Sequence, residues 1–318
     1  MTTHSPADSY RKVPYDLRAS KQIERRMIID ALMCLSRRGF DIAEYQYTGM
    51  GSVHFVDFIL FHRILGIRKM LSAEYSTGIP KRIAFNKPYR YIDVAFKAIG
   101  DVIPSLDPDL QHILWLDYDF RINKLITTDV VNAAAALSAG SFLLVTVDVE
   151  SPVEGMVSTP RKCRKYYLDN CKLFCNPGWP TQDYAESKLH ALNVRILFNA
   201  IKAGLAGRDS VSFLPLFNFS YADGHNMLTI GGMVGTAANK TAVQGCNFLD
   251  AVYLRRSFAE PEYKIPKFVL TRKEKLYLDA AMPAKRGWMP KEFEMDPDLI
   301  RDYSDVYRFY PSYAELLL

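Results

Sequence analysis

The chain has 318 residues, of which 49% are hydrophobic and 24% are charged, and its formal net charge is +5. This length allows one large α/β domain with additions or two domains, and the composition is ordinary for a soluble protein. No apolar run reaches the roughly 18–20 residues that cross a bilayer, and residues 1–15 are polar, so we predict a cytoplasmic protein without a membrane partner. Five cysteines, an odd number, argue against a disulfide framework.

The first predicted element is a helix from Ser20 to Arg38, in which apolar residues recur every four positions. Ser20 can cap its start, and Gly39 can close its end. A strand that ends at about Tyr47 follows, and then a turn with two glycines one residue apart. Val53–Leu65 predicts a second helix, which is apolar nearly all round and therefore buried.

Four further apolar runs predict strands. They cover Lys69–Tyr75, Tyr91–Phe96, Ile113–Tyr118 and Phe142–Val149. The last two are near-continuous apolar runs that end in acids, which is typical of strands covered on both faces. An alanine-rich helix, Thr127–Ser138, separates them. The alternation of strands and helices predicts a parallel sheet with helices on both sides.

The pattern changes after Glu150. Residues 158–208 are mostly helical, and two strands, Val211–Tyr221 and Asn226–Val234, are joined by an Asp-Gly turn that favours a hairpin. We therefore predict three regions: an N-terminal arm at 1–19, an α/β domain at 20–250 with a helical insertion at about 158–208, and an extension at 251–318 packed on the same domain.

The predicted extension has an uneven charge distribution. Ten Lys and Arg against four acids between 254 and 291 precede a tail, 292–318, with seven acids and two arginines. The two parts could be solvated faces that attract one another, or the basic part could form a rim for an anionic substrate.

The turn Gly49-Met50-Gly51 directly follows the first strand and precedes a helix. Glycine lets the backbone approach a ligand closely, and a helix N-terminus presents N–H groups and a partial positive charge. Dinucleotides and S-adenosylmethionine are both held at such places. His54 stands where the dinucleotide fingerprint has a third small residue, which weakens the NAD interpretation.

Acids also follow the next two predicted strands. Glu74 ends the second strand 23 residues after Gly51, where a carboxylate can accept hydrogen bonds from both hydroxyls of a ribose. Gly100-Asp101 follows the third strand, which would place Asp101 near the amino group of an adenine. Each acid could instead be a solvated residue at a strand end.

The stretch Asp117-Tyr118-Asp119-Phe120 closes the fourth strand. The carboxyl ends of parallel strands border the crevice of an open α/β sheet, so these side chains should lie opposite the glycine turn. A carboxylate there can take the proton lost by an attacking hydroxyl or amine, and an aromatic face tolerates a sulfonium cation. Asp148 and Glu150 end the fifth strand and should face the same crevice.

The order of these features resembles that of the class I S-adenosylmethionine-dependent methyltransferases. More specifically, residues from about 15 to 283 are similar to a bacterial group labelled putative O-methyltransferases. The similarity rests on Leu17-Arg18, Lys21, Glu24-Arg25, Tyr47-Thr48-Gly49-Met50-Gly51-Ser52, Phe55-Val56-Asp57-Phe58, Leu65-Gly66-Ile67, Ser72-Ala73-Glu74 and Phe85-Asn86-Lys87-Pro88. It implies a Rossmann-like fold and a bound methyl donor, with Gly49, Gly51 and Glu74 in the donor site.

We therefore predict an S-adenosylmethionine-dependent methyltransferase that methylates an oxygen, or a nitrogen, of an unidentified acceptor. Its donor site should comprise Tyr47, Gly49, Gly51, Ser52, Glu74, Asp101 and Tyr118. Asp117 and Asp119 should be the catalytic carboxylates, and Phe120 and Asp148 should contact the acceptor.

Two alternatives belong to other functional classes. The first is a non-catalytic module that uses the same fold to bind a nucleotide-like ligand or a partner protein. The second is a nucleic-acid base methyltransferase, which the basic stretches at 161–167 and 254–291 suggest. We predict no metal, because the spacing of Cys163, Cys171 and Cys175 fits no common zinc site.

Asp57 lies inside the second predicted helix, which is otherwise apolar. A buried carboxylate needs a partner. Arg18, Lys21 or Arg25 from the first helix could provide it.

Overall fold

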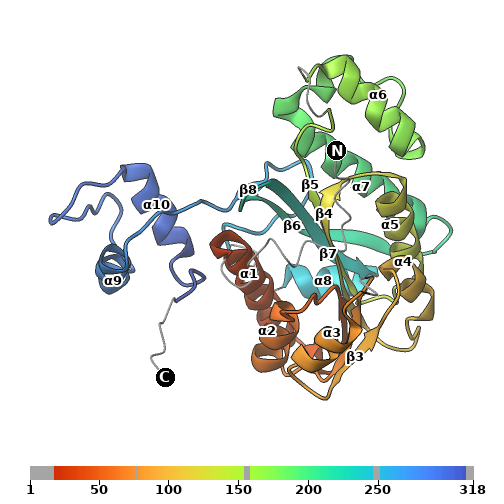
Figure 1. Ribbon diagram of the computed structural model, residues 1–318, viewed down its shortest axis with the longest axis horizontal. Helices are drawn as coiled ribbons and strands as arrows, with labels where there is room; N and C mark the ends of the chain where they lie inside the picture. Colours follow the sequence, from red (N-terminus) through yellow and green to blue (C-terminus); the bar gives the residue numbers. More distant parts are fainter. Residues whose placement is uncertain (1–17, 76–77, 154–157, 246–250, 313–318) are drawn as a thin grey trace.

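The computed structural model describes residues 18–75, 78–153, 158–245 and 251–312. Its centre is an eight-stranded sheet with the strand order β3-β2-β1-β4-β5-β7-β6-β8 (Figure 1). The strands are β1 (Gln46–Gly49), β2 (Lys69–Ala73), β3 (Ile92–Ala95), β4 (His112–Arg121), β5 (Phe142–Asp148), β6 (Ser212–Ala222), β7 (Asn226–Gly235) and β8 (Tyr263–Lys264). β1 to β5 run parallel, whereas β7 is antiparallel to both of its neighbours, β5 and β6. The predicted parallel sheet with a terminal antiparallel hairpin is confirmed.

The helices cover both faces of the sheet, as predicted. They are α1 (Ala19–Ser36), α2 (Val56–Leu65), α3 (Pro80–Asn86), α4 (Ile99–Val102), α5 (Lys124–Ala136), α6 (Pro160–Cys171), α7 (Leu189–Leu205), α8 (Ala237–Gln244), α9 (Arg272–Ala281) and α10 (Pro297–Val306). Short 3-10 turns lie at Ile42–Glu44, Ile103–Ser105, Lys172–Phe174, Thr181–Tyr184 and Glu186–Lys188. Figure 1 shows α1 and α2 on one side of the sheet and α5 and α7 on the other.

Two hydrophobic clusters, one on each side of the sheet, form the core. Along β4, Ile113 and Trp115 belong to the cluster beneath α1 and α2, whereas Leu114 and Leu116 belong to the cluster beneath α5 and α7. Successive residues of a strand point to opposite faces, so a strand buried on both faces must be apolar throughout. This explains the unbroken apolar run in the sequence.

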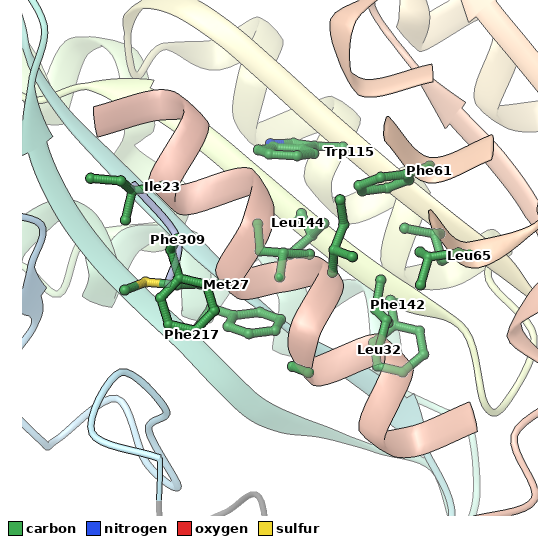
Figure 2. Packing of buried hydrophobic residues seen from close by; sticks show 14 of the residues in the cluster. Ile23, Met27, Leu32, Phe61, Leu65, Trp115, Phe142, Leu144, Phe217 and Phe309 are labelled. Carbon is green, nitrogen blue, oxygen red and sulfur yellow. The ribbon is translucent and has the colours of Figure 1, made fainter. Parts of the chain in front are cut away.

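The helix α1 lies across one face of the sheet. Figure 2 shows Ile23, Met27 and Leu32 of α1 gathered with Trp115, Phe142, Leu144 and Phe217 of the strands. Ile23, Met27 and Leu32 are each at most 1% exposed. This packing fixes the rotation of α1 and therefore the direction in which its polar residues point.

Several element boundaries differ from the predicted ones. The helix α1 begins at Ala19, so Ser20 lies inside the helix and does not cap it, and the helix ends at Ser36 rather than Arg38. The helix α5 begins three residues earlier than predicted, at Lys124, and ends at Ala136.

The helix α2 begins at Val56 rather than Val53, because Ser52 and Phe55 adopt positive φ angles of 53° and 48° and so prolong the turn. The strand β4 continues to Arg121, and its pairing with β5 is irregular between Asp117 and Arg121.

The C-terminal residues contact both the sheet and α1. β8 pairs in parallel with the outer edge of β6, and the Ile265 N–H donates to the carbonyl of Ser220 at 2.8 Å. The Tyr253 hydroxyl donates to the Asp30 carboxylate on α1 at 2.8 Å, and Phe309 belongs to the same hydrophobic cluster as Met27 of α1 (Figure 2). Among the described residues, no helix combines the length and the apolar character that a membrane crossing requires.

Candidate active site

A cleft of about 580 Å³ opens at the carboxyl ends of β1, β2 and β4. It lies where the strand order reverses, because β2 and β4 flank β1 on opposite sides and their crossovers run in opposite directions. The walls come from the start of α1, the turn after β1, the start of α2, the end of β2, α3, the start of α4, the end of β4, α5 and the β6–β7 hairpin.

The glycine turn forms one wall of the cleft. The Gly51 N–H donates to Ser72 Oγ at 3.1 Å, and Ser72 Oγ donates to Glu74 Oε1 at 2.6 Å. A Cβ on residue 51 would lie 2.7 Å from Ser72 Oγ and 2.8 Å from Phe55 Cδ1. Only glycine therefore allows the turn to approach the end of β2 this closely.

Glu74 follows β2 directly, lines the cleft and is 6% exposed. Burial raises the pKa of its carboxyl group, although hydrogen bonding from Ser72 and from the backbone of Gly51 and Ser52 lowers it in part. The carboxylate is thus held in place on one side by the turn. Its position at the cleft wall suits the recognition of a polar ligand group.

Tyr118 and Asp129 form the opposite wall. The Tyr118 hydroxyl donates to Asp129 Oδ2 at 2.7 Å, and both residues line the cleft. Gly100 packs against the Asp129 carboxylate so closely that a Cβ would collide with it. Asp101, on α4, is exposed and does not line the cleft. The acid that the structure places in this part of the cleft is therefore Asp129.

A buried lysine occupies the end of the cleft next to β4. Lys21 Nζ lies 2.9 Å from Asp117 Oδ1 and 2.8 Å from Glu24 Oε2, and it sits 4.4 Å from the centre of the Trp115 ring. Burial alone would lower the pKa of Lys21, but the two carboxylates outweigh it and raise the pKa. Lys21 is therefore charged, and Asp117 is held as its counterion.

A second buried ion pair joins α1 to α2. Arg25 Nε donates to Asp57 Oδ1, so Arg25 is the partner of Asp57 among the three residues proposed from the sequence. The Tyr47 hydroxyl lies beneath this pair and donates to Asp57 Oδ2 at 3.4 Å. Arg25 and Asp57 both line the cleft, and Arg25 is 3% exposed.

The cleft gathers most of the residues that the sequence suggested. Seven line it: Gly51, Ser52, Glu74, Asp117, Tyr118, Asp119 and Phe120. Tyr47 and Gly49 are buried behind the wall, where Gly49 packs on the Tyr47 ring. They support the site without facing it.

Asp148 lies outside the cleft. Its carboxylate accepts from the Glu150 N–H at 2.7 Å and lies 3.6 Å from His225 Nδ1. Burial raises the pKa of Asp148, and this effect exceeds the opposing ones. One ligand atom each of Asp148, Glu150 and His225 lies within 4.8 Å of the others, an arrangement that could hold a metal ion.

Sequence reasoning did not assign several cleft residues. Among these are Lys21, Arg25, Asp129, Tyr221 and Met227. For α1 a signal existed, because Arg18, Lys21 and Arg25 follow the three- and four-residue spacing that places side chains on one helix face. Asp129 carries no such signal, since nothing local distinguishes it from a solvated helix acid.

The sheet order, the terminal hairpin and the cleft at the switch point define a Rossmann-like α/β fold. Residues 13–318 match the family described as "Putative O-methyltransferase". The chain belongs to this methyltransferase family. None of the curated proteins compared matches the chain.

Solved structures with a similar fold include three methyltransferases. Trm1 from Pyrococcus horikoshii, in complex with S-adenosyl-L-methionine, is 12% identical with a TM-score of 0.39, over 67% of this chain and 58% of that one. NodS from Bradyrhizobium japonicum WM9, an N-methyltransferase in complex with S-adenosyl-L-homocysteine, is 10% identical with a TM-score of 0.38, over 73% and 99%. A putative O-methyltransferase from Klebsiella pneumoniae is 11% identical with a TM-score of 0.36, over 73% and 97%.

Proposed function

We propose that this protein transfers a methyl group from S-adenosylmethionine to an oxygen, or a nitrogen, of an acceptor that enters the cleft. The proposal rests on the position and burial of Glu74. It is a buried carboxylate at the end of β2, faces the cleft, and is held by Ser72 and the glycine turn. A carboxylate at this position of an α/β sheet accepts hydrogen bonds from the two hydroxyls of a ribose.

The rest of the donor half of the cleft fits an adenosyl group. Ala98, Ile99 and Leu125 supply apolar surface for a planar base, and Asp129 supplies an acceptor for its amino group. Asp129 takes the role that the sequence suggested for Asp101. When bound, the donor supplies an electrophilic methyl group on a sulfonium, and Tyr118 offers an aromatic face to such a cation.

The acceptor half lies toward β4 and the β6–β7 hairpin. Phe120, Tyr221 and Met227 provide apolar and aromatic walls, and Asp117 and Asp119 provide carboxylates. Asp117 is fixed by Lys21 at 2.9 Å, so its role is to orient the acceptor through a hydrogen bond. Asp119 is exposed at the mouth, where it can receive the proton that a hydroxyl loses. Positioning of the two reactants supplies the larger part of the rate.

The cysteines favour a reducing compartment. Cys34, Cys163, Cys171 and Cys175 are all free thiols in the part of the chain that the structure describes. Thiols persist in the cytoplasm, so we place the enzyme there.

Calorimetric titration with S-adenosylhomocysteine tests the proposal. We expect Glu74→Gln to weaken binding about 10- to 100-fold, because hydrogen bonds to a charged group contribute about 1.5–3 kcal/mol. The amide oxygen can still accept from Ser72, so the turn should survive. The matched control is Glu44→Gln, an exposed acid at the opposite end of the sheet that pairs with Lys69 at 3.4 Å. Equal affinity of wild type and Glu74→Gln would refute the assignment.

A further inference from the structure

Arg25 has an unsatisfied polar group in the cleft. Its Nε is engaged by Asp57, but Nη1 is buried and has no hydrogen-bond partner among the described residues. The side chain is 3% exposed and contributes to the cleft wall. A buried N–H donor without a hydrogen-bond partner destabilises the folded protein, and a charged donor does so more. This indicates that a ligand group accepts the missing hydrogen bond.

The surrounding contacts hold Arg25 in this orientation. Asp57 accepts from Nε, and its other oxygen accepts from the buried Tyr47 hydroxyl at 3.4 Å. Tyr47 is in turn packed between the rings of Phe58 and Phe61, at centroid distances of 4.8 and 4.5 Å. Asp57 therefore fixes the guanidinium at Nε and leaves Nη1 without a partner among the described residues.

The place of Arg25 in the cleft narrows the choice of ligand. Asp57 stands in the first turn of α2, immediately after the glycine turn, so Arg25 lies at the turn side of the cleft. The neighbouring cation, Lys21, is already paired with Asp117 and Glu24 at the β4 side. Arg25 keeps an N–H donor, at Nη1, that no described residue engages, so we assign it to an anionic group that reaches past the glycine turn. A guanidinium binds a carboxylate through two parallel N–H donors.

We propose that Arg25 binds the carboxylate at the amino-acid end of the methyl donor, and that Asp57 and Tyr47 position it. This inference rests on the proposed function. It makes donor recognition depend on two separate groups: Glu74 for the ribose and Arg25 for the carboxylate. Asp57, which also lines the cleft, lies beside the Arg25 guanidinium and gives this end both signs of charge, as a zwitterionic amino-acid group requires.

Two ligands separate the carboxylate from the rest of the donor. S-adenosylhomocysteine carries the amino-acid end, whereas methylthioadenosine has the same adenine, ribose and thioether but lacks it. We expect Arg25→Gln to weaken the binding of S-adenosylhomocysteine about tenfold or more in calorimetric titration. Methylthioadenosine should bind wild type and variant equally. The decarboxylated, amine-bearing analogue of S-adenosylhomocysteine should also bind the two proteins equally, because it keeps the ammonium group only.

Arg25→Gln leaves Asp57 buried without its counterion, so a second variant protects the test against misfolding. Arg25→Gln with Asp57→Asn removes both charges, and thermal unfolding should show that it is folded. Its affinity for S-adenosylhomocysteine should be reduced, and its affinity for methylthioadenosine should not. The matched control is Arg63→Gln, an exposed arginine whose Nε donates to the Tyr89 hydroxyl at 3.0 Å outside the cleft.

Each result bears on one of the two proposals. The role of Arg25 would be overturned if the folded double variant bound both ligands more weakly to the same extent. It would also be overturned if the affinity for both ligands stayed unchanged. A wild-type protein that binds neither S-adenosylhomocysteine nor methylthioadenosine would overturn the proposed function, and the inference with it. A loss confined to S-adenosylhomocysteine supports both.

Discussion

Replacing Lys21 with methionine tests whether the buried charges of the cleft are interdependent. The side chains of Lys21 and Glu24 are 3% and 0% exposed and lie 2.8 Å apart, so water screens them little. Coulomb's law with an effective dielectric constant of 20 gives about 6 kcal/mol at this distance. Methionine does not have to bury an ammonium group, and this offsets part of the lost attraction between Lys21 and Glu24. We expect a net destabilisation of about 3–5 kcal/mol, as when one partner of a buried ion pair is removed.

The pH dependence of this loss has a definite sign. Burial raises the pKa of Glu24 above its ordinary value, and Lys21 opposes that rise. Without Lys21 the folded-state pKa rises further. A raised folded-state pKa stabilises the protein below the unfolded pKa, and this contribution is lost as the pH rises through the folded pKa. The variant should therefore be closest to wild type near pH 5 and furthest from it near pH 8.

Urea denaturation measures both effects. Trp115 is a fluorescent reporter that lies 4.4 Å from the lysine nitrogen. The double variant Lys21→Met with Glu24→Gln should have a free energy of unfolding at least about 1 kcal/mol higher than that of Lys21→Met alone, because no buried charge is left without a counterion at this pair. Lys69→Met is the control, because its pair with Glu44 is about half exposed and contributes at most about 1 kcal/mol. A Lys21→Met variant within about 1 kcal/mol of wild type at pH 8, or equally destabilised at both pH values, would refute this reasoning.

Two further substitutions test the walls of the cleft. Gly51→Ala places a Cβ 2.7 Å from Ser72 Oγ, so it should move Ser72 away from Glu74 and weaken S-adenosylhomocysteine by about tenfold or more in calorimetric titration. Gly78→Ala is its control, because a Cβ there meets nothing within 4 Å, and equal binding by both variants would contradict the role of the turn. Tyr118→Phe removes the donor to Asp129 at 2.7 Å and should cost about 1–3 kcal/mol in urea denaturation near pH 8. Burial raises the pKa of Asp129 and the Tyr118 hydrogen bond opposes this, so the cost should shrink toward pH 5, and an unchanged stability at pH 8 would show that the bond does not matter.

The fold could be predicted from the sequence because a strand buried on both faces has apolar residues at consecutive positions. The runs at Ile113–Tyr118 and Phe142–Val149 are apolar at consecutive positions, as strands covered by helices on both sides require. The Asp-Gly turn between β6 and β7 marked the antiparallel end of the sheet in the same local way. Glu74 and Asp117 could be placed in the cleft for a related reason, since the carboxyl ends of parallel strands meet at one edge.

The partners across the cleft could not be read from the sequence. Lys21 meets Asp117 across 96 positions of the chain, and Arg25 meets Asp57 across 32. Periodicity shows which residues share a helix face, but the rotation of α1 is fixed by the packing of Ile23, Met27 and Leu32 on the sheet. Three candidates for the partner of Asp57 were therefore equivalent until that packing was known.

Tertiary structure also decided which acids face the cleft. Asp101 and Asp129 both lie in helices that follow a strand, yet only Asp129 lines the cleft, because Gly100 leaves room for its carboxylate and Tyr118 binds it. Asp148 ends β5 as expected but turns to Glu150 and His225. Local sequence determined which elements form and in what order, because backbone conformation and burial depend on neighbouring residues. The direction of each charged side chain depends on packing between elements distant in the chain, and only the folded structure shows it.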